Sequence, residues 1–209
     1  GSSVFPFGLG FENVQTFVLE CIESNPFISA RELAKKVVQQ ASSFDGFSPK
    51  DDITCGVIYF RNPRDMLVVT GPPVLKDNDK VVASLFDTFD GQKIVCGGTT
   101  ANILSRELNR QIKVILKDID PIVPPISEME GADMVTEGII TMGKVSEILE
   151  NGGNTDKMKR NAATRMVEMF LDSDRIRFAV GTKINEAHQD PNMPVELEIR
   201  RNIVKKIAS

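Results

Sequence analysis

A glycine-rich turn followed by two hydroxyl residues, Gly97-Gly98-Thr99-Thr100, has the residue types of a site for an anion. The apolar run Ile94–Cys96 precedes this turn and predicts a short buried strand, and the residues after it have helical spacing. Glycines let the backbone approach a ligand closely, and the N–H groups at a helix start attract negative charge. The pattern therefore predicts that a phosphate or carboxylate group binds where the strand ends and the helix begins.

Three other predicted strands also end in glycine-containing turns, at Gly71-Pro72-Pro73, Glu137-Gly138 and Gly181-Thr182. Ligands of open parallel sheets bind beyond the carboxyl ends of the strands, so we expect these ends to border one crevice. Glu137 would hold a ligand hydroxyl or a metal ion there. The predicted ligand is an anionic small molecule. The predicted ligand-binding residues are Gly97, Gly98, Thr99, Thr100, Glu137, Gly138, Gly181, Thr182 and Asn185.

These features also have a purely structural interpretation. Glycine at the end of a strand is ordinary turn chemistry, and threonine at a helix start is an ordinary N-cap. The chain lacks the G-x-G-x-x-G fingerprint and the Walker-type Lys-Ser/Thr loop, so the common nucleotide signatures do not identify the ligand. Both interpretations remain open from the sequence.

No catalytic residue is assigned from the sequence. Cys96 directly precedes the glycine turn, but no histidine is near it in the sequence, which favours a buried core thiol over a nucleophile. His188, the only histidine, lies in a polar loop and is either a surface residue or an acid–base group over the crevice. The basic residues of the last helix, Arg200 and Arg201 among them, are interpreted as a solvated face.

A second candidate for chemistry is the stretch Asp51-Asp52-Ile53-Thr54. Two carboxylates before a strand could bind a hard cation such as Mg²⁺ or Mn²⁺, which takes one or two carboxylates and several waters. Successive strand residues point to opposite faces, so only one of the two carboxylates would reach a given ion. The alternative is that both are turn and cap residues.

The elements that must position these residues predict an α/β fold. Apolar strands alternate with amphipathic helices from residue 63 to residue 209, which is typical of a mainly parallel, Rossmann-like sheet with helices on both faces. The proline-rich connection 120–128 is expected to lack regular structure. The predicted strands are 66–70, 93–96, 112–116, 133–136 and 175–180, and the predicted helices are 77–89, 99–109, 141–150, 161–171 and one that begins at Pro194.

Residues 1–62 form a separate predicted unit of helix, helix and strand, and the pattern breaks between Arg61 and Arg64. The first helix begins near Asn13, and a capping box at Ser29 starts the second. The strand Ile53–Phe60 is apolar at nearly every residue, as expected for a strand that is covered on both sides.

Composition narrows the classes of partner. The net charge of −4 predicts no basic face for nucleic acid, and the apolar runs are too short to cross a bilayer. Three widely spaced cysteines at apolar positions predict reduced, buried thiols and a cytoplasmic location. The first ten residues lack an initiator methionine, so we expect an excised part of a longer protein.

The sequence 11–60, two helices followed by SPKDDITCGVIYF, resembles the C-terminal end of metal-dependent serine/threonine phosphatases of the stage II sporulation protein E type. In that family an Asp-Asp/Asn-Ile-Thr motif opens a late strand of a two-sheet sandwich. The resemblance implies that Asp51 is a ligand of a catalytic Mn²⁺ or Mg²⁺ and that Asp52 takes the adjacent, usually non-ligating, position.

The chain departs from the family pattern because the family needs further aspartates in Asp-Gly motifs. Only one such pair, Asp45-Gly46, precedes residue 51, and it lies in the turn beside the motif. We therefore expect the C-terminal portion of a bacterial, cytoplasmic phosphatase of phosphoproteins, inactive alone, with residues 63–209 as a regulatory or ligand-sensing domain. The alternative is a stand-alone α/β domain that binds or acts on a phosphorylated small molecule at the GGTT turn.

Overall fold

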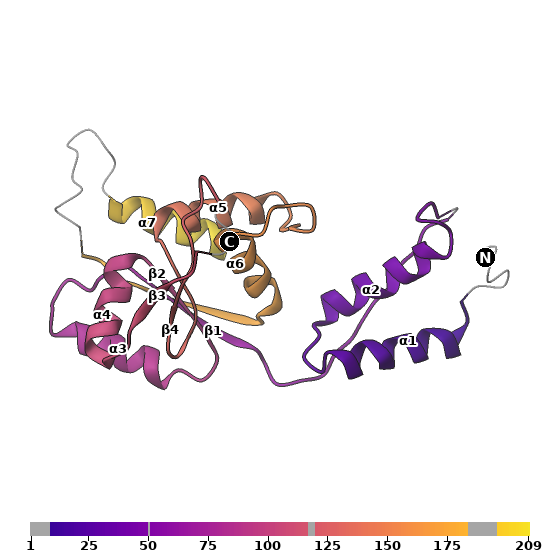
Figure 1. Cartoon of the computed structure of the whole chain (residues 1–209), viewed down its shortest axis with the longest axis horizontal. Coiled ribbons are helices and arrows are strands. Elements are labelled where there is room, and N and C mark those ends of the chain that lie inside the picture. The colour runs from indigo at the N-terminus through magenta and orange to yellow at the C-terminus, as the bar shows by residue number, and fades with distance from the viewer. Residues whose placement is uncertain (1–8, 50, 117–119, 184–195) are drawn as a thin grey trace. The chain divides into compact units, whose positions relative to one another are not determined.

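The computed structural model describes residues 9–49, 51–116, 120–183 and 196–209. Contacts within the chain divide it into two compact units, Gly1–Asn62 and Pro63–Ser209. We call them the N-terminal unit and the α/β unit, and each is described by itself (Figure 1).

The N-terminal unit contains two helices, α1 (Phe11–Ser24) and α2 (Ala30–Ser43). Ser29 caps α2, as predicted, because its side-chain oxygen accepts a hydrogen bond from the N–H of Glu32 at 3.1 Å. The two helices and the turn between them bury a small apolar cluster. Its buried residues are Cys21, Ile28 and Leu33.

The predicted strand Ile53–Phe60 is wrong, because residues 52–60 have no regular secondary structure. Its side chains alternate in exposure from Ile53 to Ile58, and Val57 packs against the small cluster, as one face of an extended segment would. A strand also needs a hydrogen-bonded partner, and the described part of the N-terminal unit contains none. Phe60 is accordingly 92% exposed, so the segment is not covered on both sides.

The α/β unit is built on a six-stranded mixed sheet, so the α/β fold class is confirmed. The order of the strands is β3-β4-β5-β2-β1-β6. Four neighbouring strands are parallel: β5 (Ala132–Thr136), β2 (Gln92–Cys96), β1 (Asp65–Thr70) and β6 (Arg175–Val180). Their carboxyl ends consequently lie at the same edge of the sheet.

The other two strands are antiparallel additions at one side of the sheet. β3 (Ile112–Val114) pairs with β4 (Ser127–Met129), and β4 pairs with β5. Strand β4 begins inside the connection that was expected to lack regular structure, so that expectation is wrong for its last two residues. The reason is local: the prolines end at Pro125, and the residues after them keep the N–H groups that a sheet requires.

Helices cover both faces of the sheet. On one face α3 (Asn78–Thr88) and α4 (Gly98–Leu108) pack together, and on the other α5 (Ile139–Glu150) contacts both α6 (Ala162–Asp172) and α7 (Glu196–Ala208) (Figure 1). Side chains of β1 alternate between the two cores, because successive strand residues point to opposite faces. None of the helices in the described ranges is long and apolar enough to cross a membrane.

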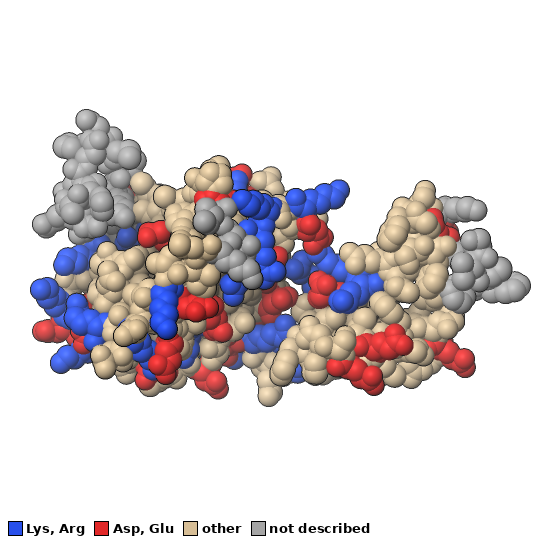
Figure 2. Space-filling model, viewed as in Figure 1, with Lys and Arg blue, Asp and Glu red and all other residues tan. Residues whose placement is uncertain are grey.

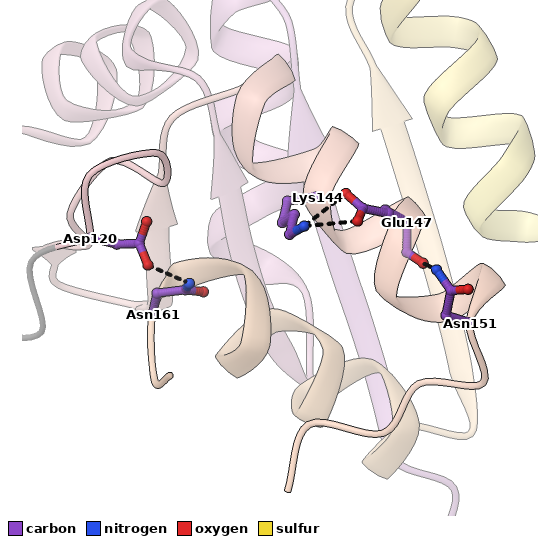
Figure 3. Close-up of polar contacts among 5 residues, drawn as sticks. All are labelled: Asp120, Lys144, Glu147, Asn151 and Asn161. Carbon is purple, nitrogen blue, oxygen red and sulfur yellow. Dashed lines mark hydrogen bonds and ion pairs between the residues drawn. The ribbon is translucent and has the colours of Figure 1, made fainter. Parts of the chain in front are cut away.

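The start of α6 is joined to the connection after β3 by polar contacts (Figure 3). Asn161 caps the helix by accepting the N–H of Thr164, and its side-chain amide donates to the Asp120 carboxylate at 3.0 Å. That carboxylate also accepts the N–H groups of Val123 and Ile122. Hydrogen bonds to the charged form lower the pKa of Asp120 to about 2, with the backbone N–H of Val123 as the largest cause.

Figure 3 also shows Lys144 and Glu147 of α5 and Asn151, which directly follows the helix. The Lys144 ammonium group lies 2.8 Å from the Glu147 carboxylate, one helical turn along. The side-chain amide of Asn151 donates to the backbone carbonyl of Glu147 at 2.8 Å, where the helix ends. These contacts satisfy a terminal carbonyl of α5, away from its glycine start.

Candidate functional site

A cavity of about 210 Å³ lies beyond the carboxyl ends of β1, β2 and β5. Strand ends, two helix starts and one side chain of α7 line it. The lining residues are Gly71, Pro72, Cys96, Gly97, Gly98, Thr99, Thr100, Glu137, Gly138, Ile139 and Arg200.

Two helices begin at this cavity without a side-chain cap. Gly97 precedes α4 and Gly138 precedes α5, and neither helix has a capping hydrogen bond from a side chain. The first N–H groups of a helix have no partner within it, so both helix starts turn donors and positive dipole ends toward the cavity region. Gly97 has a φ of 108°, a conformation that favours glycine, and a Cβ on Gly138 would lie 3.5 Å from the Gly97 Cα. The two helix starts are therefore direct neighbours.

Thr100 adds a buried hydroxyl to this cavity. The residue is 2% exposed, and its Oγ1 has no hydrogen-bond partner in the described part of the protein. A Cβ on Gly97 would lie 3.6 Å from this oxygen, so the hydroxyl lies at the start of α4. A buried hydroxyl without a partner costs about 1–3 kcal/mol, and a ligand oxygen in the cavity would remove that cost.

Arg200 brings a positive charge to the cavity from the last helix. It is 8% exposed, and its guanidinium donates to the carbonyl of Gly181 at 3.4 Å. The interpretation of Arg200 as part of a solvated face is therefore wrong, whereas Arg201 is exposed. Helical spacing could have revealed the difference, because Arg200 precedes the inward-facing Ile203 and Val204 by three and four residues.

Glu137 is the one carboxylate among the lining residues. The residue is exposed, and its Oε1 would lie 3.7 Å from a Cβ on Gly98. A carboxylate at that place accepts hydrogen bonds and donates none when it is ionised. The cavity thus combines several donors with one carboxylate.

Six of the predicted ligand-binding residues line the cavity together, namely Gly97, Gly98, Thr99, Thr100, Glu137 and Gly138. Gly181 and Thr182 are not among its lining residues. The N–H of Gly181 donates to the carbonyl of Thr70, and a side chain at position 181 would collide with the backbone of Gly71. The end of β6 packs against the end of β1 and leaves no space for a ligand between them. Asn185 and His188 lie outside the described residues.

Cys96 lies at the end of β2 and is fully buried. Burial raises the pKa of its thiol to about 12, and the nearby hydroxyl of Thr136 opposes this only in part. The thiol is therefore protonated at neutral pH, which matches the predicted core cysteine and not a nucleophile.

Asp51 belongs to the N-terminal unit and is exposed. Its carboxylate accepts the N–H of Asp52 at 2.9 Å. The described residues contain no group of three or more His, Cys, Asp or Glu side chains that could hold a metal ion. The described surroundings of Asp51 do not form a Mn²⁺ or Mg²⁺ site by themselves.

Charged side chains are mixed on the surface of the α/β unit that Figure 2 presents, with Lys and Arg beside Asp and Glu.

Comparisons with protein-family models, with curated proteins and with solved structures found no match for this chain.

Proposed function

We propose that the α/β unit is a ligand-binding domain that holds a small anionic molecule in the cavity at the ends of β1, β2 and β5. One observation carries the proposal: the buried Thr100 hydroxyl has no partner among the described residues, and it lies where two uncapped helix starts and Arg200 line one cavity. Each of these groups interacts favourably with a negatively charged oxygen.

The strand order supports this proposal. The parallel strands β5-β2-β1-β6 follow the order of the first four strands of a Rossmann-like sheet, in which the chain turns back past its first strand. The cavity lies at the carboxyl ends of the strands, where such sheets bind ligands. It lies beyond β1, β2 and β5, because the contact between Gly71 and Gly181 fills the space between the ends of β1 and β6.

The chemistry of the lining favours binding over catalysis. Cys96 is protonated at neutral pH, and Glu137 is the only carboxylate that lines the cavity within the described residues. We therefore prefer a regulatory or ligand-sensing role to an enzymatic reaction on a phosphorylated small molecule.

For the whole protein, we propose that the N-terminal unit is the C-terminal tail of a bacterial, cytoplasmic phosphatase of the stage II sporulation protein E type. Two helices precede the Asp51 motif, as in that family. The segment 53–60 alternates between half-buried and exposed residues as far as Ile58 and has no partner strand among the described residues, which suits a strand of a larger sheet. The intact enzyme would use Mn²⁺ or Mg²⁺ on phosphoproteins, and the α/β unit would adjust its activity.

The ligand-binding proposal is tested by the melting temperature of the chain with inorganic phosphate, sugar phosphates and nucleotides. A ligand at about 100 times its Kd stabilises the folded state by about 2.7 kcal/mol, which is a shift of several degrees. The Gly98→Val substitution should abolish the shift, because its side chain enters open space beside Glu137. If none of these anions changes the melting temperature, the proposal is wrong.

The phosphatase proposal needs a longer chain. Extension with the sequence encoded before Gly1 should yield Mn²⁺-dependent release of phosphate from phosphoproteins, and Asp51→Ala should remove that activity. Release of phosphate by the 209-residue chain alone would contradict the expectation that this chain lacks most of the metal-binding aspartates.

A further inference from the structure

We infer that the ligand of the cavity is a small phosphate monoester that carries hydroxyl groups, with its phosphate at the two helix starts and a hydroxyl on Glu137. The inference rests on the proposed binding function and adds the chemical class of the ligand. The number of donors, the Glu137 carboxylate and the size of the cavity point to this class of ligand.

The cavity combines positive groups that attract an anion with the carboxylate of Glu137. Each helix start is equivalent to roughly half a positive charge, so the starts of α4 and α5 together contribute about one. The Arg200 guanidinium contributes one more. The Glu137 carboxylate subtracts one charge, so the lining favours an anion and the number of donors, not the net charge, separates a phosphate from a carboxylate.

The number of donors favours a phosphate over a carboxylate. The N–H groups of Gly98, Thr99 and Thr100 belong to the first turn of α4, where the helix supplies no partner. The Thr100 hydroxyl and the start of α5 add further donors. Three terminal oxygens of a phosphate can accept from these groups together, whereas a carboxylate has two oxygens.

Glu137 explains why the ligand must be more than a phosphate ion. Its carboxylate lies in the same cavity and repels a bare anion. An ionised carboxylate is an acceptor only, so it is satisfied by a group that donates. A hydroxyl on the organic part of an ester is neutral and donates a hydrogen bond, and it would place the ester in one orientation.

The cavity limits the size of that organic part. Its volume of about 210 Å³ lies below the range of about 300–1,000 Å³ that is usual for pockets holding drug-sized ligands. A molecule of the size of a triose or pentose phosphate is compatible with this space, and a dinucleotide exceeds it.

The test measures Kd by isothermal titration calorimetry with glycerol 3-phosphate, propyl phosphate, inorganic phosphate, glycerol and serine. Glycerol 3-phosphate and propyl phosphate have the same phosphate and the same carbon chain, so they differ only in hydroxyl groups. We expect glycerol 3-phosphate to bind at least tenfold more tightly than propyl phosphate or inorganic phosphate, and glycerol not to bind.

The Glu137→Gln variant provides a two-sided check. It should weaken the binding of glycerol 3-phosphate and tighten the binding of inorganic phosphate, because the repulsion is removed together with the strong acceptor. Glu130→Gln is the matched control, since Glu130 is exposed and does not line the cavity. Its affinities should equal those of the unaltered protein.

The outcomes separate this inference from the proposed function. Equal affinities for glycerol 3-phosphate and propyl phosphate, or tighter binding of serine, would overturn the ligand class while anion binding stands. An unchanged preference in Glu137→Gln would overturn the role of that carboxylate. Failure of every anion to bind would overturn the proposed function itself.

Discussion

Replacement of Thr100 by valine separates the cost of its buried hydroxyl from the use of that hydroxyl in binding. Valine is also β-branched and of similar volume, so the packing at the start of α4 is kept. Without a ligand, the change removes the hydroxyl of a residue that is 2% exposed, and this hydroxyl has no partner in the described part of the chain. The cost removed is about 1 kcal/mol at the lower end of the range for an unsatisfied hydroxyl. The melting temperature should therefore rise by about 2–4 °C.

With a bound anion the same variant should be the weaker binder. A hydrogen bond to a charged group contributes about 1.5–3 kcal/mol, so Thr100→Val should raise Kd for the best phosphate ligand roughly 10- to 150-fold. Titration calorimetry measures the affinity, and scanning calorimetry without ligand measures the stability. The two effects have opposite signs, and a merely structural hydroxyl would not produce that combination.

Thr141→Val is the matched control. Thr141 is fully buried near the start of α5, its hydroxyl also has no described partner, and it does not line the cavity. This variant should likewise raise the melting temperature and leave the affinity unchanged. The reasoning is refuted if both variants bind phosphate ligands as the unaltered protein does, or if Thr100→Val lowers the melting temperature without ligand.

Three further predictions concern other groups. Arg200→Gln should weaken phosphate binding at least tenfold in calorimetric titration, because a charge-assisted contact is lost. Arg201 is exposed, so Arg201→Gln should leave the affinity unchanged. Equal losses of affinity in the two variants would mean that only the net charge of the protein matters. The pKa of Asp120 is lowered to about 2 in the folded protein, so its stabilising contribution is present above about pH 4 and is lost as the pH falls toward 2. The difference in melting temperature between the unaltered protein and Asp120→Asn should shrink across that window, and a difference that is constant from pH 6 to 2 would contradict the cause given. The pKa of Cys96 is about 12, so a thiol reagent at pH 8 should modify the partly exposed Cys55 quickly and Cys96 only after unfolding; rapid modification of Cys96, identified by mass spectrometry, would contradict its burial.

Local patterns in the sequence were sufficient for the α/β class and for the core of the candidate site. Gly97, Thr100 and Glu137 follow apolar strands, and the parallel arrangement of those strands brings their carboxyl ends to one edge. The N-cap at Ser29 was equally predictable, because one hydroxyl and the N–H three residues later are enough to form it. In each case the relevant interaction is local, or follows from the strand direction.

Other features depend on contacts between distant segments, which a local pattern does not contain. The stretch Ile53–Phe60 has the composition of a buried strand, but a strand requires a partner that the described N-terminal unit does not supply. Gly181 follows a strand as Gly97 does, yet it packs against Gly71 because β6 lies beside β1. The same residue type therefore lines a cavity at one strand end and closes a gap at another.

The sequence by itself determined the strands and helices of the α/β unit other than β4, and it determined that glycine and threonine follow a central strand. Apolar periodicity and turn chemistry act over a few residues, so they can be read without the fold. Only the tertiary structure decided that Arg200 lies at the same cavity as Thr100, a hundred positions earlier in the chain, and that two helix starts meet there. The reason is that docking of α7 on the sheet depends on packing across the whole unit. The GGTT turn becomes a candidate phosphate site through those distant groups, because they supply the charge and the enclosure that the turn alone lacks.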